Sequence, residues 1–199
     1  MPELPLVLAI TGASGAPYAV RLLQGLAAAG QPTWLIVSDH GFRLLDTESG
    51  IASIEALREH VGAAAWDASV RVFDDRDRGA LPASGSVRTK GMVICPCSMG
   101  TVAAIAAGTS RSLVERAADV VLKERRTLIV VPRETPYSDI HLENMLRLTR
   151  AGGVVLPASP GFYHRPQRIE ELVDFVVGRI LDHVDVKNDL PRWSGGDQQ

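Results

Sequence analysis

Apolar, β-branched runs recur at six places along the chain and predict six strands. They lie at 4–11, 33–38, 70–73, 91–96, 127–132 and 154–157. Between most of these runs the apolar residues are spaced three or four apart, the period of an amphipathic helix. The most regular helical pattern runs over 169–181, near the end of the chain. Strands and helices are therefore expected to alternate.

This alternation predicts an α/β fold with a parallel sheet and helices on both of its faces. Strands that are apolar throughout are typical of a sheet that is covered on both sides. Ligands in such folds bind at the carboxyl ends of the strands. The residues that follow each strand are therefore the first candidates for a functional site.

The size and composition of the chain fit one domain. It has 199 residues, of which 46% are hydrophobic, enough to bury a substantial core. We expect one domain over residues 1–186. A polar, glycine-containing tail follows over residues 187–199, with Trp193 as its apolar anchor.

The charge and the short apolar stretches exclude several classes of protein. Lys and Arg number 21 and Asp and Glu 23, so the net charge of -2 gives no overall field that would attract nucleic acid or an anionic membrane. Stretches such as 102–107 are too short to span a bilayer, and the first four residues lack the layout of a signal peptide. We expect a cytoplasmic protein without a membrane span or a nucleic-acid partner.

The cysteines and histidines do not indicate a metal site. Cys95 and Cys97 lie in an apolar run without a second pair of ligands, and we expect them to be core thiols on opposite faces of a strand. The five histidines show no spacing typical of metal ligands. We therefore expect no metal.

The turn after the first strand is a candidate phosphate or flavin loop. Gly12 and Gly15 allow a tight turn and a close approach of the backbone to a ligand, and Pro17 suits a first helical turn. Free N–H groups at such a helix start would face an anion or a polar ring edge. The alternatives are a purely structural turn and a short-chain dehydrogenase, with Asp39 on a ribose. The Tyr-x-x-x-Lys pair of those dehydrogenases is absent.

Polar residues also follow three other strands. Ser38 comes after the second strand, with Glu48 farther on, and 98–101 begins a helix after the fourth. Hydroxyls at these places suit either a phosphate or helix capping. Arg133 and Glu134 follow the fifth strand in a turn stiffened by prolines, where packing does not explain two charges.

Two cations share one face of the helix predicted over 112–124. Arg116 and Lys123 are seven residues apart and could clamp a phosphate. The alternative, which the pattern alone favours, is a solvated face on which Asp119 pairs with Lys123. Tyr163 follows the sixth strand, and Arg179 lies on the last helix.

Six motifs, taken in order, carry a resemblance to a known family. They are 11–15 (Thr-Gly-Ala-Ser-Gly), 83–86 (Ala-Ser-Gly-Ser), 96–99 (Pro-Cys-Ser-Met), 115–124 (Glu-Arg-Ala-Ala-Asp-Val-Val-Leu-Lys-Glu), 131–136 (Val-Pro-Arg-Glu-Thr-Pro) and 160–163 (Pro-Gly-Phe-Tyr). Their order and spacing resemble the UbiX flavin prenyltransferase family over nearly the whole chain. The range 46–77 has no family motif besides Glu48.

The resemblance implies a flavodoxin-like variant of the Rossmann fold and a homo-oligomer, commonly a dodecamer, with active sites at subunit junctions. It implies that FMN contacts Gly12, Ala13, Ser14, Ser38, Ser98, Met99, Gly100, Thr101 and Arg133. It implies that dimethylallyl phosphate contacts Ser84, Gly85, Arg116, Lys123, Tyr163 and Arg179, some of them from a neighbouring subunit. The phosphate clamp is thereby favoured over the solvated face.

The implied reaction joins a dimethylallyl group to N5 and C6 of reduced FMN. The product, prenylated FMN, would serve a UbiD-type decarboxylase in ubiquinone biosynthesis or aromatic acid breakdown. Basic groups such as Lys123 would stabilise the phosphate leaving group without magnesium. The family places Ser14 near N5 and makes Glu134 a proton carrier, while Glu48 would position groups or relay a proton.

Two other functions remain open. A flavin-dependent cysteine decarboxylase resembles a Pro-Ala-Ser-Ala-Asn pattern where this chain has Pro-Cys-Ser-Met-Gly at 96–100, and no catalytic histidine can be placed. A non-catalytic flavin-binding subunit of a hydroxyarylic acid decarboxylase would not need Arg116, Lys123, Glu134, Tyr163 and Arg179 together. Both readings are therefore less favoured than the prenyltransferase.

Overall fold

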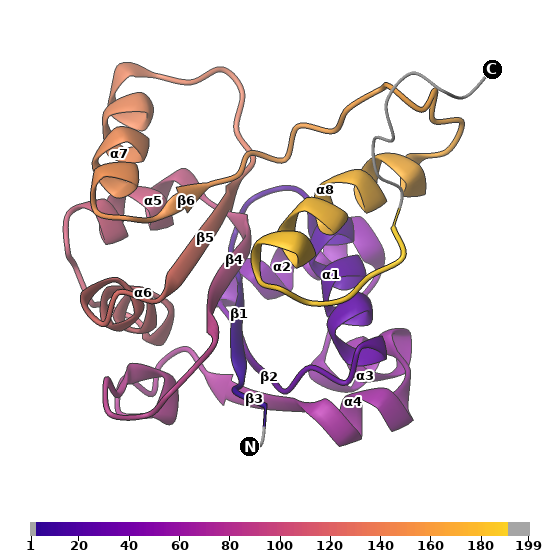
Figure 1. The fold of residues 1–199 in the computed structure, drawn as a ribbon, viewed down its shortest axis with the longest axis horizontal. Helices are drawn as coiled ribbons and strands as arrows, with labels where there is room; N and C mark the ends of the chain where they lie inside the picture. The colour runs from indigo at the N-terminus through magenta and orange to yellow at the C-terminus, as the bar shows by residue number, and fades with distance from the viewer. Residues whose placement is uncertain (1–2, 191–199) are drawn as a thin grey trace.

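The computed structural model describes residues 3–190, and the six predicted strands are all present in it (Figure 1). The strands are β1 (Leu6–Ile10), β2 (Thr33–Val37), β3 (Val70–Asp74), β4 (Gly91–Cys97), β5 (Thr127–Pro132) and β6 (Val154–Val155). They form one parallel sheet in the order β3-β2-β1-β4-β5-β6. The predicted α/β fold with a parallel sheet is confirmed.

Helices cover both faces of this sheet, as predicted. The helices are α1 (Ala16–Ala28), α2 (Asp39–Ser49), α3 (Ile54–Val61), α4 (Ala63–Ser69), α5 (Met99–Ala106), α6 (Leu113–Lys123), α7 (Asp139–Arg150) and α8 (Ile169–His183), with a short 3-10 turn η1 (Leu81–Ala83). In Figure 1, α5, α6 and α7 lie on one side of the sheet and α1, α2, α3 and α8 on the other.

The core has two halves because successive side chains of a strand point to opposite faces. In β1, Leu6, Leu8 and Ile10 pack with α1 and α8, whereas Val7 and Ala9 pack with α5 and α6. All five are at most 1% exposed. Burial on both faces explains why the first strand is apolar throughout, without alternation.

The strand order reverses between β1 and β4. The chain proceeds outward from β1 through β2 to β3, and then returns to the centre to continue from β4 through β5 to β6. At such a reversal the loops leaving the two central strands diverge, which opens a crevice at their carboxyl ends. The topology therefore fixes where a ligand site is expected.

Cys95 and Cys97 lie in different halves of the core, as expected, but the sequence argument alone does not account for it. Residues two apart share a face in a regular strand. The pairing of β4 with β5 shifts register between Ile94 and Cys97, and this irregularity turns Cys97 to the opposite side from Cys95. Burial raises the pKa of both thiols, which keeps them protonated and unreactive.

The first residues of the expected tail pack on the domain. Leu190 lies partly buried against the core, and the side chain of Asn188 donates a hydrogen bond to Asp182 Oδ1 at 3.2 Å. Apolar anchoring of this segment thus begins before Trp193, which lies outside the described residues.

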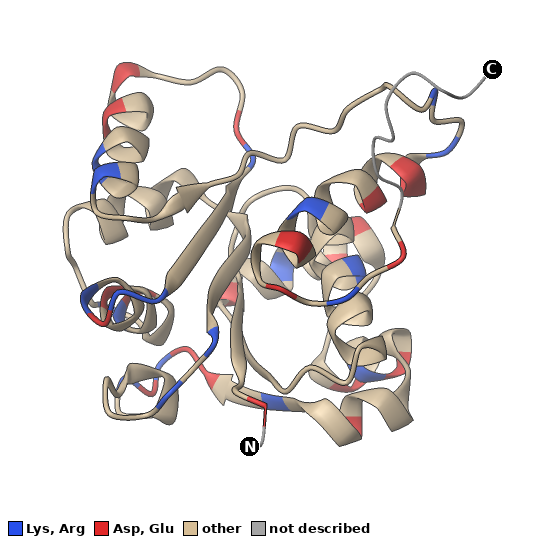
Figure 2. Ribbon diagram, in the orientation of Figure 1, with Lys and Arg blue, Asp and Glu red and all other residues tan. Residues whose placement is uncertain are grey.

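Charged residues are spread over the helices and loops, and the central strands are almost free of them (Figure 2). Both signs occur side by side on α7 and α8, in keeping with the nearly balanced composition. No helix within residues 3–190 is long and apolar enough to cross a membrane.

Candidate functional site

A cavity of about 250 Å³ lies at the carboxyl ends of β1, β2 and β4, where the strand order reverses. It is lined by Thr11, Gly12, Ser38, His40, Asp75, Ser98, Thr101, Ser112, Val114 and Glu115. Four of these residues, Gly12, Ser38, Ser98 and Thr101, belong to the set predicted to contact FMN. The structure thus brings residues from three strand ends to one place.

Three of the lining residues are N-caps. The hydroxyl oxygens of Ser38, Ser98 and Ser112 accept hydrogen bonds from backbone N–H groups of α2, α5 and α6, at 3.1, 3.2 and 3.4 Å. For Ser38 and Ser98, the sequence left phosphate binding and capping as alternatives. The structure confirms the capping, and the same residues line the cavity. Both roles are compatible, because a capped helix start still presents other N–H groups.

Two carboxylates accept hydrogen bonds from helix starts at the site, one at α1 and one at α6, which Ser112 also caps. Glu48 Oε2 accepts hydrogen bonds from the backbone N–H groups of Gly15 and Ala16 at the start of α1, both at 2.8 Å. Asp75 Oδ1 accepts from the N–H of Val114 at the start of α6, at 2.9 Å. In the described residues no carboxylate accepts from the starts of α2 and α5; Asp39, in the first turn of α2, pairs with Arg76 instead. Their partial positive charge is therefore what the cavity offers to an anion.

The Glu48 contact corrects one expectation. We predicted that the free N–H groups at the start of the first helix would face a ligand, but those of Gly15 and Ala16 are bonded within the protein. Burial opposes ionisation of Glu48, but hydrogen bonds from Gly15, Ser14 and Ala16 and the nearby charge of Arg133 outweigh it and lower the pKa of this carboxyl. Of the two roles considered for Glu48, this geometry fits positioning.

Thr11 connects the two central strands at the cavity. Its Oγ1 donates to the carbonyl oxygen of Pro96 at 3.0 Å and accepts from the N–H of Ser98 at 2.9 Å. The side chain is only 3% exposed, so both bonds are sheltered from water. They hold the loop after β1 in register with the turn that begins α5.

Gly12 is required by the packing of this loop on α2. A Cβ atom at Gly12 would lie 2.5 Å from Cβ of His40, closer than such atoms approach in folded proteins. Any other residue would force the start of α2 away from β1. The sequence predicted that the backbone at Gly12 lies close to a ligand. In the structure Gly12 lines the cavity and also lies against His40.

Arg133, at the end of β5, braces the same loop from the other side. Its Nε donates to the carbonyl oxygen of Ser14 at 3.2 Å, and its charge acts on Glu48. The neighbouring Glu134 is half-buried and accepts a hydrogen bond from the N–H of Thr135 at 3.0 Å. The structure therefore brings Ser14, Glu48, Arg133 and Glu134 to the carboxyl edge of the sheet.

A second group of predicted residues lies at the opposite edge of the sheet. A Cβ atom at Gly85 would lie 2.8 Å from Nζ of Lys123, and Arg126 Nη2 donates to the carbonyl oxygen of Gly85 at 2.8 Å. Arg126 immediately precedes β5, so this group lies at the amino ends of the strands. The 11 residues of α6 place Lys123 about 16 Å from the cavity end of that helix.

The remaining residues predicted to contact dimethylallyl phosphate do not line the cavity. Arg116 Nη1 pairs with Asp119 Oδ2 at 2.8 Å, and Lys123 pairs with Glu124. The pair of Asp119 with Lys123, which the solvated-face alternative supposed, is not formed. Tyr163 is 72% exposed in the loop before α8, and Arg179 lies on α8 near Asp182. One chain therefore does not assemble this predicted set.

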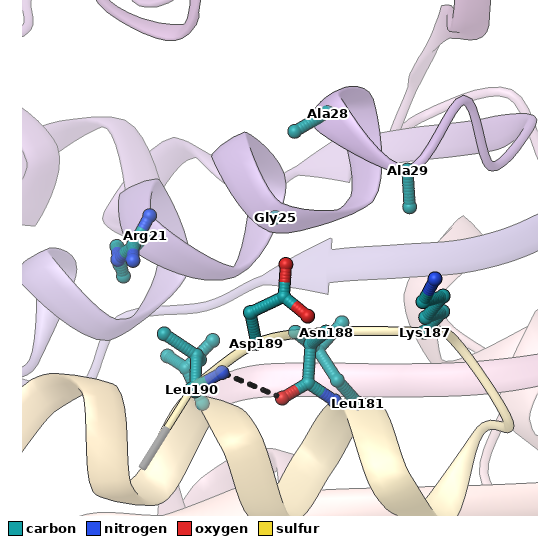
Figure 3. A pocket seen from close by; sticks show the side chains of 10 residues that line it. Arg21, Gly25, Ala28, Ala29, Leu181, Lys187, Asn188, Asp189 and Leu190 are labelled. Atoms are coloured by element: carbon teal, nitrogen blue, oxygen red, sulfur yellow. Dashed lines mark hydrogen bonds between the residues drawn. The ribbon is translucent and has the colours of Figure 1, made fainter.

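A further cavity, of about 500 Å³, lies between α1, α8 and the segment that follows α8 (Figure 3). Arg21, Gly25 and Ala28 of α1 line one side, and Asn188 and Leu190 line the other. None of the predicted site residues lines it. Within residues 3–190 no cluster of three or more His, Cys, Asp or Glu side chains is arranged to hold a metal ion.

Sequence reasoning missed six residues that line the cavity: Thr11, His40, Asp75, Ser112, Val114 and Glu115. Asp75 lies in a range without any motif, and only the fold brings it to the start of α6. Ser112 and Glu115 did carry a signal, because Ser-x-x-Glu before an apolar run is typical of a helix start. That pattern could have directed attention to this end of α6.

A cavity at the reversal of strand order, next to the starts of α2 and α5, is typical of α/β proteins that bind nucleotides or flavins. The fold and the site therefore place the protein in this class. Residues 1–181 match the family model described as Flavoprotein. A flavin prenyltransferase UbiX from Pseudomonas aeruginosa is 51% identical over 196 residues, which are 94% of this chain and 93% of that protein. The chain therefore belongs to the flavoproteins and, within them, to the flavin prenyltransferase UbiX family.

Two solved structures agree with this assignment. A UbiX protein in complex with FMN and dimethylallyl pyrophosphate has a TM-score of 0.89 and 40% identity, and the match covers 97% of this chain and 98% of that one. A dodecameric FMN-dependent UbiX-like decarboxylase from Escherichia coli O157:H7 has a TM-score of 0.88 and 40% identity, with coverage of 96% and 100%. The predicted flavodoxin-like variant of the Rossmann fold is confirmed.

Proposed function

We propose that this protein joins the dimethylallyl group of dimethylallyl phosphate to N5 and C6 of reduced FMN, and that a UbiD-type decarboxylase uses the prenylated FMN. The observation that carries the proposal is the cavity at the strand-order reversal, where the starts of α2 and α5 are open to an anion. Family membership supplies the class of reaction.

The residues at this edge of the sheet fit FMN. The N–H groups and hydroxyls at the starts of α2 and α5 suit the phosphate, through Ser38, the segment 98–101 and the neighbouring Gly12. The backbone around Ala13 and Ser14, braced by Arg133, offers polar groups to the flavin ring. Bound there, the flavin supplies the nucleophilic atoms of the reaction. Ser14 would lie beside N5, and the ionised Glu48 would hold the loop in place.

The allylic substrate needs groups that one chain does not bring together. Ser84, Gly85 and Lys123 lie at the amino edge of the sheet, away from the cavity. We propose that neighbouring copies complete the site in a homo-oligomer, for which the dodecameric solved relative provides precedent. Contacts from Arg116, Tyr163 and Arg179 would be added in the same way.

The charged side chains have distinct tasks in this proposal. Breaking the allylic C–O bond leaves negative charge on the phosphate, and fixed cations such as Arg116 and Lys123 stabilise charge that grows in the transition state. In diphosphate-dependent transferases magnesium neutralises the charge of the leaving group, and in this proposal the cationic side chains do so. When C6 bonds to the double bond of the dimethylallyl group, C6 loses a proton and the double bond gains one. Glu134, half-buried beside Arg133, would accept the proton from C6 and return it to that group.

A decisive experiment is anaerobic incubation of the protein with reduced FMN and dimethylallyl phosphate, followed by mass spectrometry of the released flavin. A flavin heavier by one five-carbon unit supports the proposal, and a parallel reaction with the diphosphate defines the preferred donor. Unmodified FMN from protein that binds it tightly would instead favour a non-catalytic flavin-binding subunit or a flavin-dependent cysteine decarboxylase.

A further inference from the structure

Glu115 is a buried carboxylate in the wall of the cavity. It lies in the first turn of α6, is 9% exposed, and lines the cavity together with the N-caps of α2 and α5. In the sequence it stands out only as part of the motif 115–124 and of the Ser-x-x-Glu pattern at a helix start.

The carboxylate of Glu115 organises the turn that precedes α6. Its Oε2 accepts hydrogen bonds from Thr109 Oγ1 at 3.0 Å and from the backbone N–H of Arg111 at 2.8 Å. Its Oε1 accepts from Arg111 Nη2 at 3.0 Å. Burial opposes ionisation, but the bonds from Arg111 and Thr109 outweigh it and lower the pKa of Glu115. The turn 109–111 is thus folded around a negative charge.

Asp75 fixes the same wall from outside the helix. Its carbonyl oxygen accepts from the N–H of Leu113 at 2.7 Å, and its Oδ1 accepts from Val114. With Ser112 bonded to the N–H of Glu115, the first-turn N–H groups of α6 are used within the protein. This side of the cavity therefore acts as a shaped wall, whereas α2 and α5 supply the groups that attract an anion.

We infer that Glu115 is a positioning residue for FMN: it holds the turn 109–111 and Ser112 against the cavity and so shapes the pocket for the phosphate end of the flavin. This inference rests on the proposed function. The inference predicts that FMN affinity falls when the charge of Glu115 is removed, because the ordered wall is lost. Electrostatics alone predicts the opposite, since removing a negative charge beside a phosphate strengthens binding.

The test is the FMN affinity of the purified full-length protein, measured by quenching of flavin fluorescence. Glu115→Gln keeps the size of the side chain but replaces one acceptor oxygen by a donor that faces Arg111. We expect the dissociation constant for FMN to rise about tenfold, which is the effect of losing one or two hydrogen bonds to a charged acceptor. At saturating reduced FMN, kcat should stay near the wild-type value while KM for FMN rises.

The chain offers a matched control in Glu171. This residue also lies in the first turn of a helix, α8, where its Oε2 accepts from the N–H of Gln167 at 2.8 Å and its Oε1 from Arg168. It does not line the cavity. Glu171→Gln should therefore leave the affinity for FMN unchanged.

A second variant covers the case in which Glu115→Gln fails to fold. Thr109→Val removes one donor and leaves the buried charge paired with Arg111, so a smaller loss of FMN affinity is expected. Unchanged or tighter FMN binding in folded Glu115→Gln, or in Thr109→Val if only that variant folds, overturns the inference. A fall in kcat at unchanged KM for FMN also overturns it. If the wild-type protein itself binds no FMN, the proposed function fails instead.

Discussion

Glu48 Oε2 lies 2.8 Å from the backbone nitrogen of Gly15 and accepts its hydrogen bond, although 33 residues separate the two in sequence. The carboxylate thereby occupies the start of α1 and holds the loop after β1. Helix starts attract anions, so a carboxylate of the protein at a helix start occupies a position where an anionic ligand could bind. Here the start of α1 is filled from within.

The lowered pKa of Glu48 predicts a pH-dependent contribution to stability. The folded-state pKa lies below the ordinary value of 4.5. The stabilisation is therefore complete above about pH 4.5 and is lost as the pH falls through the lowered folded-state pKa. Glu48→Gln should lower the thermal unfolding midpoint at neutral pH, and its difference from wild type should shrink in acid. A difference that stays constant from neutral pH to about pH 3 would contradict this account.

Replacing Thr11 should destabilise the protein. Thr11→Val keeps the shape of the side chain but leaves the carbonyl of Pro96 and the N–H of Ser98 without their shared partner. The expected loss is about 1–3 kcal/mol in the free energy of unfolding, measured by chemical denaturation. Thr47→Val, which removes an exposed helical hydroxyl bonded to the carbonyl of Arg43, should change little. Equal effects in the two variants would show that burial of Thr11 is unimportant.

Adding one methyl group at Gly12 should weaken FMN binding. In Gly12→Ala the new Cβ overlaps His40, so the start of α2 must move away from the cavity. We expect the dissociation constant for FMN to rise at least tenfold, since a displaced helix start no longer faces the phosphate (about 1.4 kcal/mol). Gly79→Ala, at a loop position with only the side chain of Asp77 nearby, is the control. If Gly12→Ala binds FMN as tightly as wild type does, the flavin does not bind in the cavity beside Gly12.

Lys123→Ala should separate flavin binding from catalysis. Because Lys123 is remote from the cavity within its own chain, FMN binding should persist. Prenylation should fall by about 100-fold or more, the usual effect of removing a fixed donor that stabilises transition-state charge. Flavin titration and the mass-spectrometric assay give the two readouts. Turnover equal to wild type would remove Lys123 from the proposed machinery.

Complementation tests whether two copies build one site. Arg133→Ala damages the cavity edge and Lys123→Ala the opposite edge, so co-expressed variants should form some sites with both halves intact and regain part of the activity. The control pairs Lys123→Ala with Arg116→Ala. Both changes lie on α6, so every α6 in this mixture carries one of them. A site that takes Arg116 and Lys123 from the same helix therefore stays defective. Equal activity of the two mixtures would argue against sites shared between chains.

The sequence was sufficient for the architecture because the strand signal is local. A buried parallel strand such as β1 needs consecutive apolar residues, and that pattern is visible without knowledge of its neighbours. The first loop and the strand ends followed from the same logic, since ligands gather where parallel strands end.

What the sequence could not supply are contacts that cross the fold. Asp75 caps α6 from the far end of β3, and Glu48 reaches the start of α1 from the end of α2. Neither bond leaves a trace in local spacing. Asp119 illustrates the same limit at short range, because spacings of three and four are both allowed on a helix and the structure selects Arg116 as its partner.

The register shift in β4 makes the two thiols independent reporters of motion. Cys95 and Cys97 are fully buried in opposite layers, so a labelling reagent reaches each thiol only when its own layer opens. In Cys95→Ala the labelling rate of Cys97 measures opening of the layer formed by α5, α6 and α7, and in Cys97→Ala the rate of Cys95 measures that of α1 and α8. A single irregular pairing thus allows the local stability of both halves of the core to be measured separately.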